Sequence, residues 1–338
     1  MAKVAINGFG RIGRAIFKIM LATPSLEIVG LNDIVPPDNL AYLLKYDTVY
    51  GRYEKAVEST EHSLIIDGRE YPVYNIKDPT QLPWEELAVD IAIESTGVFT
   101  KTEDLKKHVE AGARYVILSA PVKGDGIGTV VHGVNKPGKP SQIISCASCT
   151  TNAITPPMEI MHRHIGVKKA LMTTVHAYTS SQQLVDSPSK KFRRGRAAAA
   201  NLVPTSTGAA IATTKAMPEL EGKFDGQAIR APVAVGSIAD IVFLAARQTS
   251  VEEVNRIFWE EAQSDRYIGI LGVSDEPLVS SDIIKDSRAA IIDLELTQVI
   301  DGDLVKIMSW YDNEWGYSSQ LVREAARIAS EIKDLRRA

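Results

Sequence analysis

The chain has few cysteines, no long apolar run and almost no excess of one charge. Only two of its 338 residues are cysteines, too few for a disulfide framework, so we expect a reducing, cytoplasmic location. No apolar stretch reaches the roughly 18 residues that a membrane-crossing helix needs, and no membrane partner is expected. The formal net charge of −4 gives no reason to expect nucleic-acid binding. Length and composition instead allow two globular domains.

The N-terminal segment has the pattern of a dinucleotide-binding unit. An apolar strand predicted at residues 3–7 leads into Gly8-Phe9-Gly10-Arg11-Ile12-Gly13, which is followed by a helical apolar spacing. A second predicted strand, at residues 27–31, ends near Asp33, twenty residues after Gly13. Glycines at these positions let a pyrophosphate approach the helix N-terminus, and the acid can bind ribose hydroxyls.

Strands and helices then alternate as in a doubly wound fold. Further strands are predicted at residues 90–94, 115–118, 129–131 and 142–145, with a helix at 101–111. Most of these strands end in small or polar residues, as expected beside a cofactor crevice. The fold class is therefore α/β, with an N-terminal Rossmann domain.

The pattern changes after Cys149. Longer β-prone runs follow at residues 169–176, 227–230, 237–247, 289–299 and 304–311, and Asp301-Gly302 between the last two is a hairpin signal. These runs predict an α+β catalytic domain with a mostly antiparallel sheet. We place the Rossmann domain at residues 1–148, completed by a C-terminal helix at 315–338, and the catalytic domain at 149–314.

The segment Ser145-Cys146-Ala147-Ser148-Cys149-Thr150-Thr151-Asn152 carries both cysteines, three residues apart. It joins an apolar strand to a segment that can become helical. Unpaired N–H groups and the helix dipole at such a junction stabilise an anion, so we expect a thiolate accessible near neutral pH. Most isolated cysteines are small buried hydrophobes, but the neighbouring hydroxyls of Ser148, Thr150 and Thr151 favour a reactive Cys149 that faces an anionic ligand.

A reactive cysteine needs a base, and six histidines are available. His162 and His164 would lie roughly 20 Å from Cys149 along a helix, too far to share a proton. His176 ends a β run and opens a long loop, where catalytic residues are commonly displayed. We therefore predict that Cys149 and His176 form the catalytic pair, and we expect no metal site.

Motifs along essentially the whole chain resemble those of phosphorylating glyceraldehyde-3-phosphate dehydrogenases. They include INGFGRIGR at the start, ASCTTN around Cys149, TTVHAYTSSQ around His176, and MSWYDNEWGY near the end. The resemblance implies reversible oxidation of glyceraldehyde 3-phosphate to 1,3-bisphosphoglycerate, with inorganic phosphate and a nicotinamide cofactor, through a Cys149 hemithioacetal and thioester. This is a reaction of glycolysis and gluconeogenesis.

The resemblance also assigns roles to matching residues. It makes Cys149 the nucleophile and His176 the base. The attacking phosphate would be held by Ser148, Thr150, Thr207 and Gly208. The phosphate of the substrate would be held by Thr179 and Arg230, and Arg194 would serve both phosphates. The positions that match cofactor contacts are Asn7, Gly8, Gly10, Arg11, Ile12, Gly13, Asp33, Lys77, Ser95, Thr96, Gly97, Ser119 and Asn313.

A few positions depart from the family pattern. Cys146 stands where asparagine is usual, and Ser181 replaces the common Asp or Thr beside the phosphate site. Residues 231–236 differ from the run that usually follows Arg230. The predicted cofactor is NAD, because Asp33 would repel a 2′-phosphate, although Ser187 could donate to one, which leaves NADP or dual use as the alternative.

Three other functions compete with this interpretation. An erythrose-4-phosphate dehydrogenase would differ at Thr207-Gly208, which this chain keeps. A thiol redox protein would pair Cys146 with Cys149, but a strand residue three positions away lies about 10 Å off, beyond disulfide reach. A non-catalytic nucleotide-binding regulator would not need Cys149 and His176 together.

The long segment at residues 178–200 has no clear period and is rich in basic residues. A solvated basic loop is one interpretation. Against it, the four alanines at 197–200 permit close approach of another surface, and a loop of this length is usually functional or a subunit contact. In the family that the chain resembles, this loop packs between subunits, so the resemblance implies a homotetramer.

Overall fold

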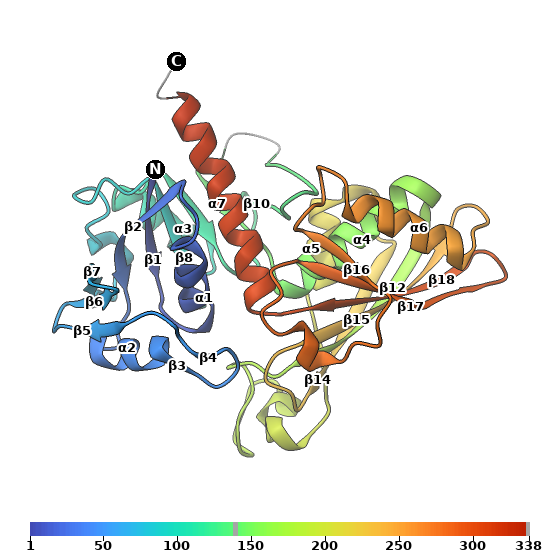
Figure 1. Ribbon diagram of the computed structural model, residues 1–338, viewed down its shortest axis with the longest axis horizontal. Coiled ribbons are helices and arrows are strands. Elements are labelled where there is room, and N and C mark those ends of the chain that lie inside the picture. Colours follow the sequence, from blue (N-terminus) through green and yellow to red (C-terminus); the bar gives the residue numbers. More distant parts are fainter. Residues whose placement is uncertain (138–140, 336–338) are drawn as a thin grey trace. The chain divides into compact units, whose positions relative to one another are not determined.

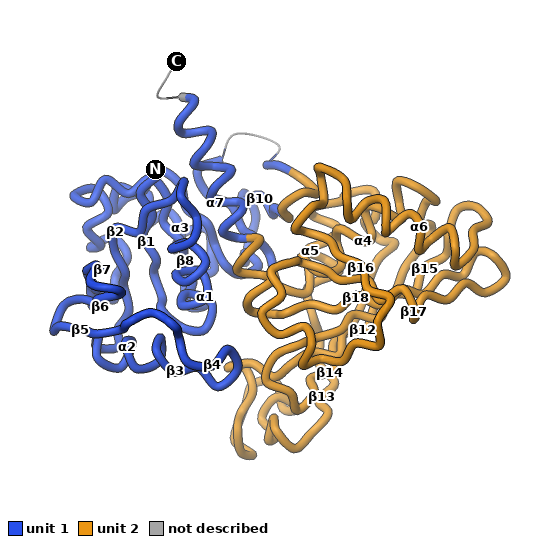
Figure 2. The backbone as a smooth tube through the Cα atoms, viewed as in Figure 1, with its two compact units in different colours: residues 1–130, 136–147, 321–338 blue, residues 131–135, 148–320 orange. Residues whose placement is uncertain are grey.

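The computed structural model describes residues 1–137 and 141–335, which divide into two compact units (Figure 2). Unit 1 consists of residues 1–130, 136–147 and those from 321 onward, and unit 2 of residues 131–135 and 148–320. The terminal helix α7 (Trp315–Leu335) begins in unit 2 and ends in unit 1. It starts where we predicted, and residues 336–338 of the predicted helix lie outside the described residues.

Unit 1 is built on a nine-stranded sheet with the order β10-β11-β9-β8-β1-β2-β7-β6-β5 (Figure 1). In this spatial order, the strands from β10 to β7 pair in parallel, and β6 and β5 extend the sheet with antiparallel pairs. The strands are β1 (Ala2–Asn7), β2 (Leu26–Asn32), β5 (Val57–Ser59), β6 (Ser63–Ile66), β7 (Arg69–Tyr74), β8 (Ile91–Glu94), β9 (Tyr115–Leu118), β10 (Gly128–Thr129) and β11 (Ile143–Ser145).

The helices of unit 1 pack their apolar residues on this sheet. They are α1 (Arg11–Met20), α2 (Pro37–Lys45) and α3 (Thr102–Glu110), with a 3-10 turn η1 (Pro79–Gln81) and a small hairpin of β3 (Tyr46–Asp47) and β4 (Gly51–Arg52). The predicted Rossmann architecture is confirmed. One predicted strand is wrong in extent: the predicted residues 129–131 form a strand over Gly128–Thr129 only, and Val130 adds a single N–H bond to the Ser145 carbonyl.

Unit 2 is built on a seven-stranded sheet with the order β13-β14-β12-β15-β18-β17-β16. The strands are β12 (Val167–Ala177), β13 (Val203–Ser206), β14 (Phe224–Ala231), β15 (Ser237–Ala245), β16 (Leu271–Ser274), β17 (Ala290–Ile300) and β18 (Leu304–Tyr311). Only β12–β14 and β16–β17 pair in parallel, so the mostly antiparallel prediction is confirmed. Asp301 and Gly302 adopt φ of 48° and 72° and form the predicted hairpin turn between β17 and β18.

One face of this sheet is covered by helices. The covering helices are α4 (Cys149–Ile165), α5 (Ala209–Ala216) and α6 (Val251–Ala262), and the 3-10 turns of the unit are η2 (Phe192–Gly195), η3 (Ala198–Ala200), η4 (Pro218–Leu220) and η5 (Ser280–Ile283). Helix α4 contacts α5, α6, β17 and β18. Its residues Ile154, Met158 and Met161 are fully buried in the core of the unit.

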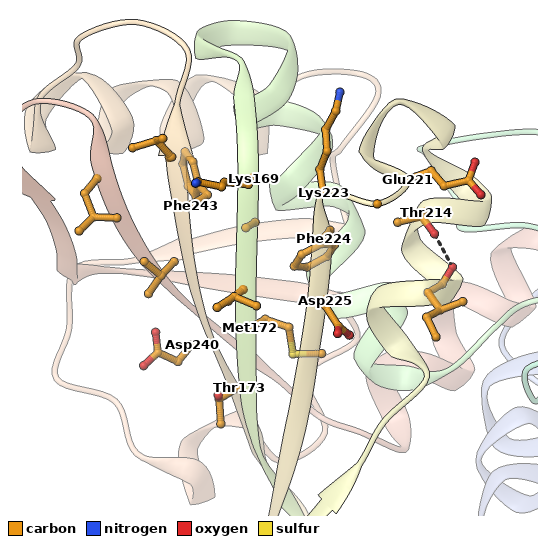
Figure 3. Close-up of a pocket in the computed structure, with 17 residues that line it drawn as sticks. Lys169, Met172, Thr173, Thr214, Glu221, Lys223, Phe224, Asp225, Asp240 and Phe243 are labelled. Carbon is orange, nitrogen blue, oxygen red and sulfur yellow. Dashed lines mark hydrogen bonds between the residues drawn. The ribbon is translucent and has the colours of Figure 1, made fainter.

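On the other face of the sheet, side chains are partly or largely exposed. Residues of β15 alternate between buried and half-exposed along the whole strand, and Leu171 on β12 is 67% exposed. A groove of about 1080 Å³ runs over this face and is lined by Leu171, Thr173, Asp240 and Val242, among others (Figure 3). The alternation sets one row of side chains in the core and leaves the opposite row outside.

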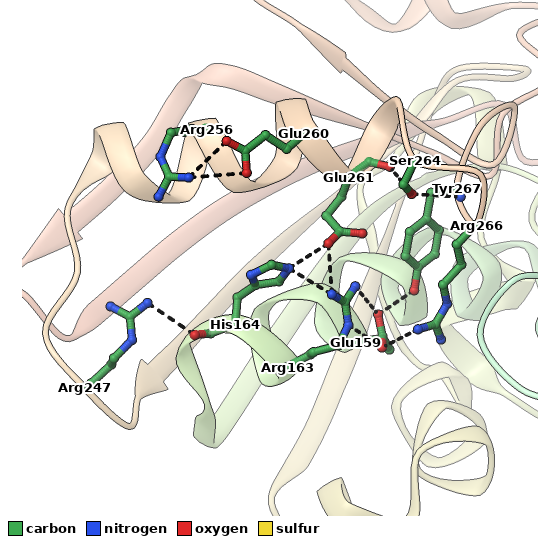
Figure 4. Close-up of polar contacts among 10 residues, drawn as sticks. All are labelled: Glu159, Arg163, His164, Arg247, Arg256, Glu260, Glu261, Ser264, Arg266 and Tyr267. Atoms are coloured by element: carbon green, nitrogen blue, oxygen red, sulfur yellow. Dashed lines mark hydrogen bonds and ion pairs between the residues drawn. The ribbon is translucent and has the colours of Figure 1, made fainter.

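The C-terminal end of α4 is held by a network of ion pairs (Figure 4). Glu159 accepts bonds from Arg163, from Arg266 on the loop after α6, and from the Tyr267 hydroxyl at 2.6 Å. Arg163 also pairs with Glu261 at 2.9 Å. This network ties the end of α4 to α6 and the segment that follows it.

In the described part of the chain, no helix is long and apolar enough to cross a membrane.

Candidate functional site

Cys149 lies at the first residue of α4, as the strand-to-helix junction predicted. The turn before the helix places Ala147 at φ 55°, a left-handed conformation that is uncommon for a residue with a side chain. Ser148 then caps the helix, because its hydroxyl accepts a bond from the Thr151 N–H at 3.1 Å. The turn and cap leave Cys149 half-buried, with its Sγ 3.3 Å from Nε2 of His176.

The parallel pairing of β12 with β14 brings His176 beside Arg230, since the two residues are register partners. His176 is 4% exposed, and its Nδ1 lies 2.6 Å from the carbonyl oxygen of Ala177. Arg230 Nη1 donates to that carbonyl at 2.9 Å and lies 2.6 Å from Nδ1. One strand therefore carries the imidazole and its neighbour carries a cation that faces the same ring.

Burial shifts the pKa of both members of the pair. Burial raises the pKa of the Cys149 thiol above its ordinary value, although Arg230 and hydrogen bonds from Thr150 act in the opposite direction. Burial and the positive charge of Arg230 lower the pKa of His176 to about 3. The helix N-terminus alone therefore does not lower the pKa of the Cys149 thiol, because desolvation acts more strongly on it.

Tyr311 is a member of this cluster that the sequence analysis did not single out. Its hydroxyl lies 3.0 Å from Thr150 Oγ1 and 2.7 Å from Thr174 Oγ1. Its ring meets that of His176 edge to face, with centroids 5.9 Å apart. Tyr311 ends β18 inside the MSWYDNEWGY motif, so the motif marked the segment, but only the sheet order showed which residue reaches the pair.

Two groups of predicted anion-binding residues flank the pair. Thr179 Oγ1 lies 2.9 Å from Ser181 Oγ, and Arg194 donates to Thr205 Oγ1 at 2.9 Å and to Ser181 Oγ at 3.4 Å. Gly208 is the N-cap residue of α5, and the hydroxyl of Thr207 accepts the N–H of Ala209 at 3.2 Å. These residues supply hydroxyls, a guanidinium and a helix start, which are groups that can bind an anion.

Arg194 and Arg230 form no ion pair with an acidic residue in the described ranges; their hydrogen bonds reach hydroxyls, carbonyls and His176. Arg230 Nε is buried and has no hydrogen-bond partner. Burial lowers the pKa of both guanidinium groups. Two partly buried cations without a counter-charge make this a region that can bind an anion.

Unit 1 contains a second site, a crevice of about 400 Å³ at the carboxyl ends of its strands. Of the predicted cofactor residues, those that line it are Asn7, Gly8, Gly10, Asp33, Lys77, Ser95 and Thr96. A Cβ added at Gly10 would have no atom within 4 Å, whereas one at Gly13 would overlap the carbonyl oxygen of Gly8. The glycines thus leave open space over the turn and let α1 pack tightly below it, which fits a dinucleotide pyrophosphate.

The remaining predicted cofactor residues have other partners or places. Arg11 pairs with Asp47 at 2.6 Å, Ile12 follows it in the first turn of α1, and Gly97 adopts a positive φ of 73° after β8. Ser119 donates its N–H to the Glu94 carbonyl at 2.9 Å. Asn313 belongs to unit 2, where its Oδ1 accepts from Gly236 N and Ser237 Oγ.

Asp33 has a structural role that the sequence analysis did not give it. Its carboxylate accepts the Phe9 N–H at 2.7 Å and the Val35 N–H at 3.0 Å. The first bond ties the end of β2 to the glycine-rich turn, and the second is the turn contact typical of Asp. Because each carboxylate oxygen has two lone pairs, these bonds leave acceptor capacity for a ribose hydroxyl.

Across the described ranges, no group of three His, Cys, Asp or Glu side chains gathers closely enough to hold a metal ion.

The sequence analysis did not single out four buried residues beside the crevice: Asn32, Trp84, Glu94 and His108. Glu94 ends β8, directly before Ser95-Thr96-Gly97. An acidic residue at the end of an apolar strand is the sequence feature that could have identified it.

Two family models match the chain. The model "Glyceraldehyde 3-phosphate dehydrogenase, NAD binding domain" matches residues 2–102, and "Glyceraldehyde 3-phosphate dehydrogenase, C-terminal domain" matches residues 148–313. Together they span the glycine-rich turn of unit 1 and the Cys149–His176 cluster of unit 2.

Curated relatives match over nearly the full length. A glyceraldehyde-3-phosphate dehydrogenase of Thermotoga maritima is 51% identical over 326 residues, 95% of this chain and 97% of the relative. One of Geobacillus stearothermophilus is 47% identical over 332 residues, 97% and 98% of the two chains. One of Streptomyces coelicolor is 47% identical over 335 residues, 98% and 99%. The chain therefore belongs to the glyceraldehyde-3-phosphate dehydrogenase family and is an NAD-dependent oxidoreductase.

Proposed function

We propose that Cys149 and His176 carry out the oxidative phosphorylation of glyceraldehyde 3-phosphate to 1,3-bisphosphoglycerate, with inorganic phosphate as the second substrate. The observation that carries this proposal is the 3.3 Å separation of Cys149 Sγ and His176 Nε2 at the start of α4. A thiol in hydrogen-bond reach of a neutral imidazole is an activated nucleophile, because the ring can take the proton as sulfur attacks.

The steps follow from this pair. Cys149 sulfur adds to the aldehyde carbon, and the thiol proton passes through His176 to the aldehyde oxygen, which gives a hemithioacetal. His176 then accepts the hydroxyl proton as the carbon loses a hydride, and a thioester remains on Cys149. NAD, when bound, accepts that hydride. A phosphate oxygen finally attacks the thioester carbon and the C–S bond breaks. The thiolate takes the proton from His176, and the proton of the attacking phosphate leaves to solvent.

Two phosphate positions are needed, one for each phosphate that this chemistry holds. We assign Thr179 and Arg230 to the phosphate of the substrate, and Ser148, Thr150, Thr207 and Gly208 to the attacking phosphate, with Arg194 serving both. The absence of acidic partners for either arginine among the described residues supports this assignment, since a guanidinium binds phosphate through charge-assisted, often bidentate bonds.

We assign the crevice of unit 1 to NAD, with the pyrophosphate over Gly10 and the adenosine ribose at Asp33. The two compact units then act as the dinucleotide-binding and catalytic domains. The open space at Gly10 and the polar lining by Asn7, Lys77 and Thr96 support this assignment. The chain is proposed to work in the cytoplasm.

We further propose a homotetramer. The exposed sheet face of unit 2 is one surface that supports this assembly, because Leu171 is 67% exposed beside the half-exposed residues of β15. The loop at residues 178–200 is another. It folds back on itself through the Gln183 N–H to the Arg194 carbonyl, yet it exposes Leu184 and Phe192 by 76% and 89%. Exposed apolar side chains on these two surfaces support a subunit contact there.

The test is reduction of NAD, measured with glyceraldehyde 3-phosphate and inorganic phosphate, with erythrose 4-phosphate and with NADP as parallel arms. We expect NAD reduction that requires both glyceraldehyde 3-phosphate and inorganic phosphate. Equal rates with erythrose 4-phosphate, or no dependence on phosphate, would contradict the assignment. Light scattering should give four times the 36.9 kDa chain mass, and a fully active monomer would contradict the tetramer.

A further inference from the structure

Beneath the crevice of unit 1 lies a buried hydrogen-bond network that includes several of its lining residues. Its centre is Glu94, at the carboxyl end of β8, which is fully buried together with Trp84 and His108. No lysine or arginine reaches this carboxylate among the described residues; its partners are Asn7, Thr96 and His108. A buried carboxylate of this kind has to be satisfied by hydrogen bonds.

Four donors converge on Glu94. Oε2 accepts from Asn7 Nδ2 at 2.6 Å and from His108 Nε2 at 3.1 Å. Oε1 accepts the Thr96 N–H at 2.8 Å and the Thr96 hydroxyl. An ionised carboxylate offers about four acceptor positions, so every one of them is used. One of these bonds holds the amide of Asn7, one comes from His108, and two hold Thr96.

The proton position on His108 is set by Trp84. The indole N–H of Trp84 can only donate, and it lies 3.1 Å from His108 Nδ1. Nδ1 is therefore the acceptor, and the ring proton resides on Nε2, where it points at Glu94. Trp84 thus selects the one tautomer of His108 that can donate to the carboxylate.

The network continues across the strand ends. Asn7 Oδ1 accepts from Asn32 Nδ2 at 2.7 Å, and the same Asn32 amide joins the N–H and carbonyl of Ile76, next to Lys77. Asn7, Asn32, Ile76 and Thr96 all line the crevice. The buried carboxylate therefore connects the floor of the crevice from β8 through β1 to the segment after β7.

We propose that Glu94, oriented by His108 and Trp84, is a positioning residue that holds Asn7 and Thr96 in the arrangement that binds NAD. This inference rests on the proposed assignment of the crevice to NAD. Glu94 touches no ligand itself. Without it, the amide of Asn7 and the hydroxyl of Thr96 lose the acceptor that orients them, and the cofactor has to impose their arrangement at a cost in affinity.

The test measures the Kd of NAD by titration calorimetry and the Tm of each variant without NAD. Glu94→Gln keeps the shape of the side chain but turns an amide toward groups that donate, so we expect Kd to rise about tenfold. His108→Leu should have a similar effect, and His108→Gln, which can again donate to Glu94, should recover part of it. KM for the aldehyde at saturating NAD should change less than about twofold, because the catalytic pair is untouched.

Leu105→Ala is the matched control, because Leu105 is fully buried on the same helix, in the apolar core that includes Trp84, and carries no polar group. It should lower Tm, yet leave Kd within about twofold. Equal Kd values for Leu105→Ala and His108→Leu at equal Tm loss would overturn the proposal, as would an unchanged Kd in a folded Glu94→Gln variant.

A further variant separates this inference from the crevice assignment itself. Gly10 has φ −69° and free space at its Cβ, so Gly10→Leu should fold and place its side chain in the crevice. We expect a large loss of NAD binding. If Gly10→Leu binds NAD normally, the crevice assignment is wrong; if Gly10→Leu loses NAD while Glu94→Gln does not, only the positioning role is wrong.

Discussion

The two ends of helix α4 use arginine in opposite ways. At the C-terminal end, Arg163 pairs with Glu159 and Glu261, and Arg266 pairs with Glu159 (Figure 4). At the N-terminal end, beside Cys149, Arg230 and Arg194 bond only to neutral groups in the described part of the chain. The same residue type therefore stabilises the fold at one end and is left available at the other.

This difference indicates which arginines await a ligand. Hydrogen bonds that Arg163 donates to Glu261 and Glu159 raise the pKa of Arg163, whereas burial lowers the pKa of Arg230. A paired arginine gains its stabilisation within the chain, while an unpaired and partly buried one is stabilised when an anion arrives. This contrast is consistent with the proposal that the N-terminal end of α4 binds phosphate.

The largest expected effect comes from Cys149→Ser. An alcohol has a pKa far above that of a thiol and is a poor nucleophile at neutral pH. Phosphorylating oxidation should be abolished, while the Kd of NAD stays unchanged. A variant that keeps more than about a tenth of the wild-type kcat, a difference of only ~1.4 kcal/mol, would show that Cys149 is not the nucleophile.

His176→Asn should lower kcat by about 10²- to 10⁴-fold, the usual contribution of a positioned acid–base group. It should also slow alkylation of Cys149 by iodoacetamide near neutral pH, since Cys149 Sγ and His176 Nε2 lie within hydrogen-bond reach at 3.3 Å. Alkylation can be followed by mass spectrometry, with Cys149→Ser as the blank. Unchanged alkylation would disprove the coupling between the two side chains.

Replacing Arg230 by leucine tests the role of the arginine near the N-terminal end of α4 that has no acidic partner in the described part of the chain. Loss of a charge-assisted bond to phosphate, roughly 1.5–3 kcal/mol, should raise KM for glyceraldehyde 3-phosphate by about one to two decades, and KM for unphosphorylated glyceraldehyde far less. Arg163→Leu, at the paired end, is the control and should leave both KM values unchanged. Equal losses on the two aldehydes would make Arg230 structural.

The smallest effect is expected from Glu159→Gln, which removes the ion pairs of Glu159 with Arg163 and Arg266 at the C-terminal end of α4. Burial raises the pKa of Glu159, but hydrogen bonds from Arg163 and Tyr267 outweigh this effect and hold the pKa below its ordinary 4.5. Its stabilising contribution is therefore present above about pH 4.5 and is lost as the pH falls through the lowered pKa. Urea unfolding should show a loss of about 1–2 kcal/mol at pH 7.

That difference should shrink as the pH is lowered toward about 3, with kcat unaffected at neutral pH. A variant that stays equally destabilised at every pH would indicate that packing, rather than the charge of Glu159, holds this end of α4.

Local sequence patterns were sufficient for the elements and for several site residues. The glycine spacing predicted the turn under the crevice, and Asp301-Gly302 predicted the β17–β18 hairpin. The strand-to-helix junction placed Cys149 at the start of α4. Each of these features depends on residues close together in the chain, where glycine conformation, capping and side-chain alternation act directly.

Beyond the Cys149–His176 pair, the sequence revealed little about which distant residues contact one another. Tyr311 reaches Thr150 and Thr174 because β18, β15 and β12 are neighbours, and no spacing along the chain encodes that order. The raised pKa of Cys149 was also missed, because desolvation depends on everything packed around the thiol.

The sequence by itself thus determined which chemical groups are present and where each local element begins. The tertiary structure alone decided which groups meet: His176 beside Arg230 through the parallel register of β12 and β14, and Glu94 with His108 through the packing of α3 on the sheet. The physical reason is that strand order, register and burial are set by the whole core, whereas turns and caps are set by a few neighbouring residues.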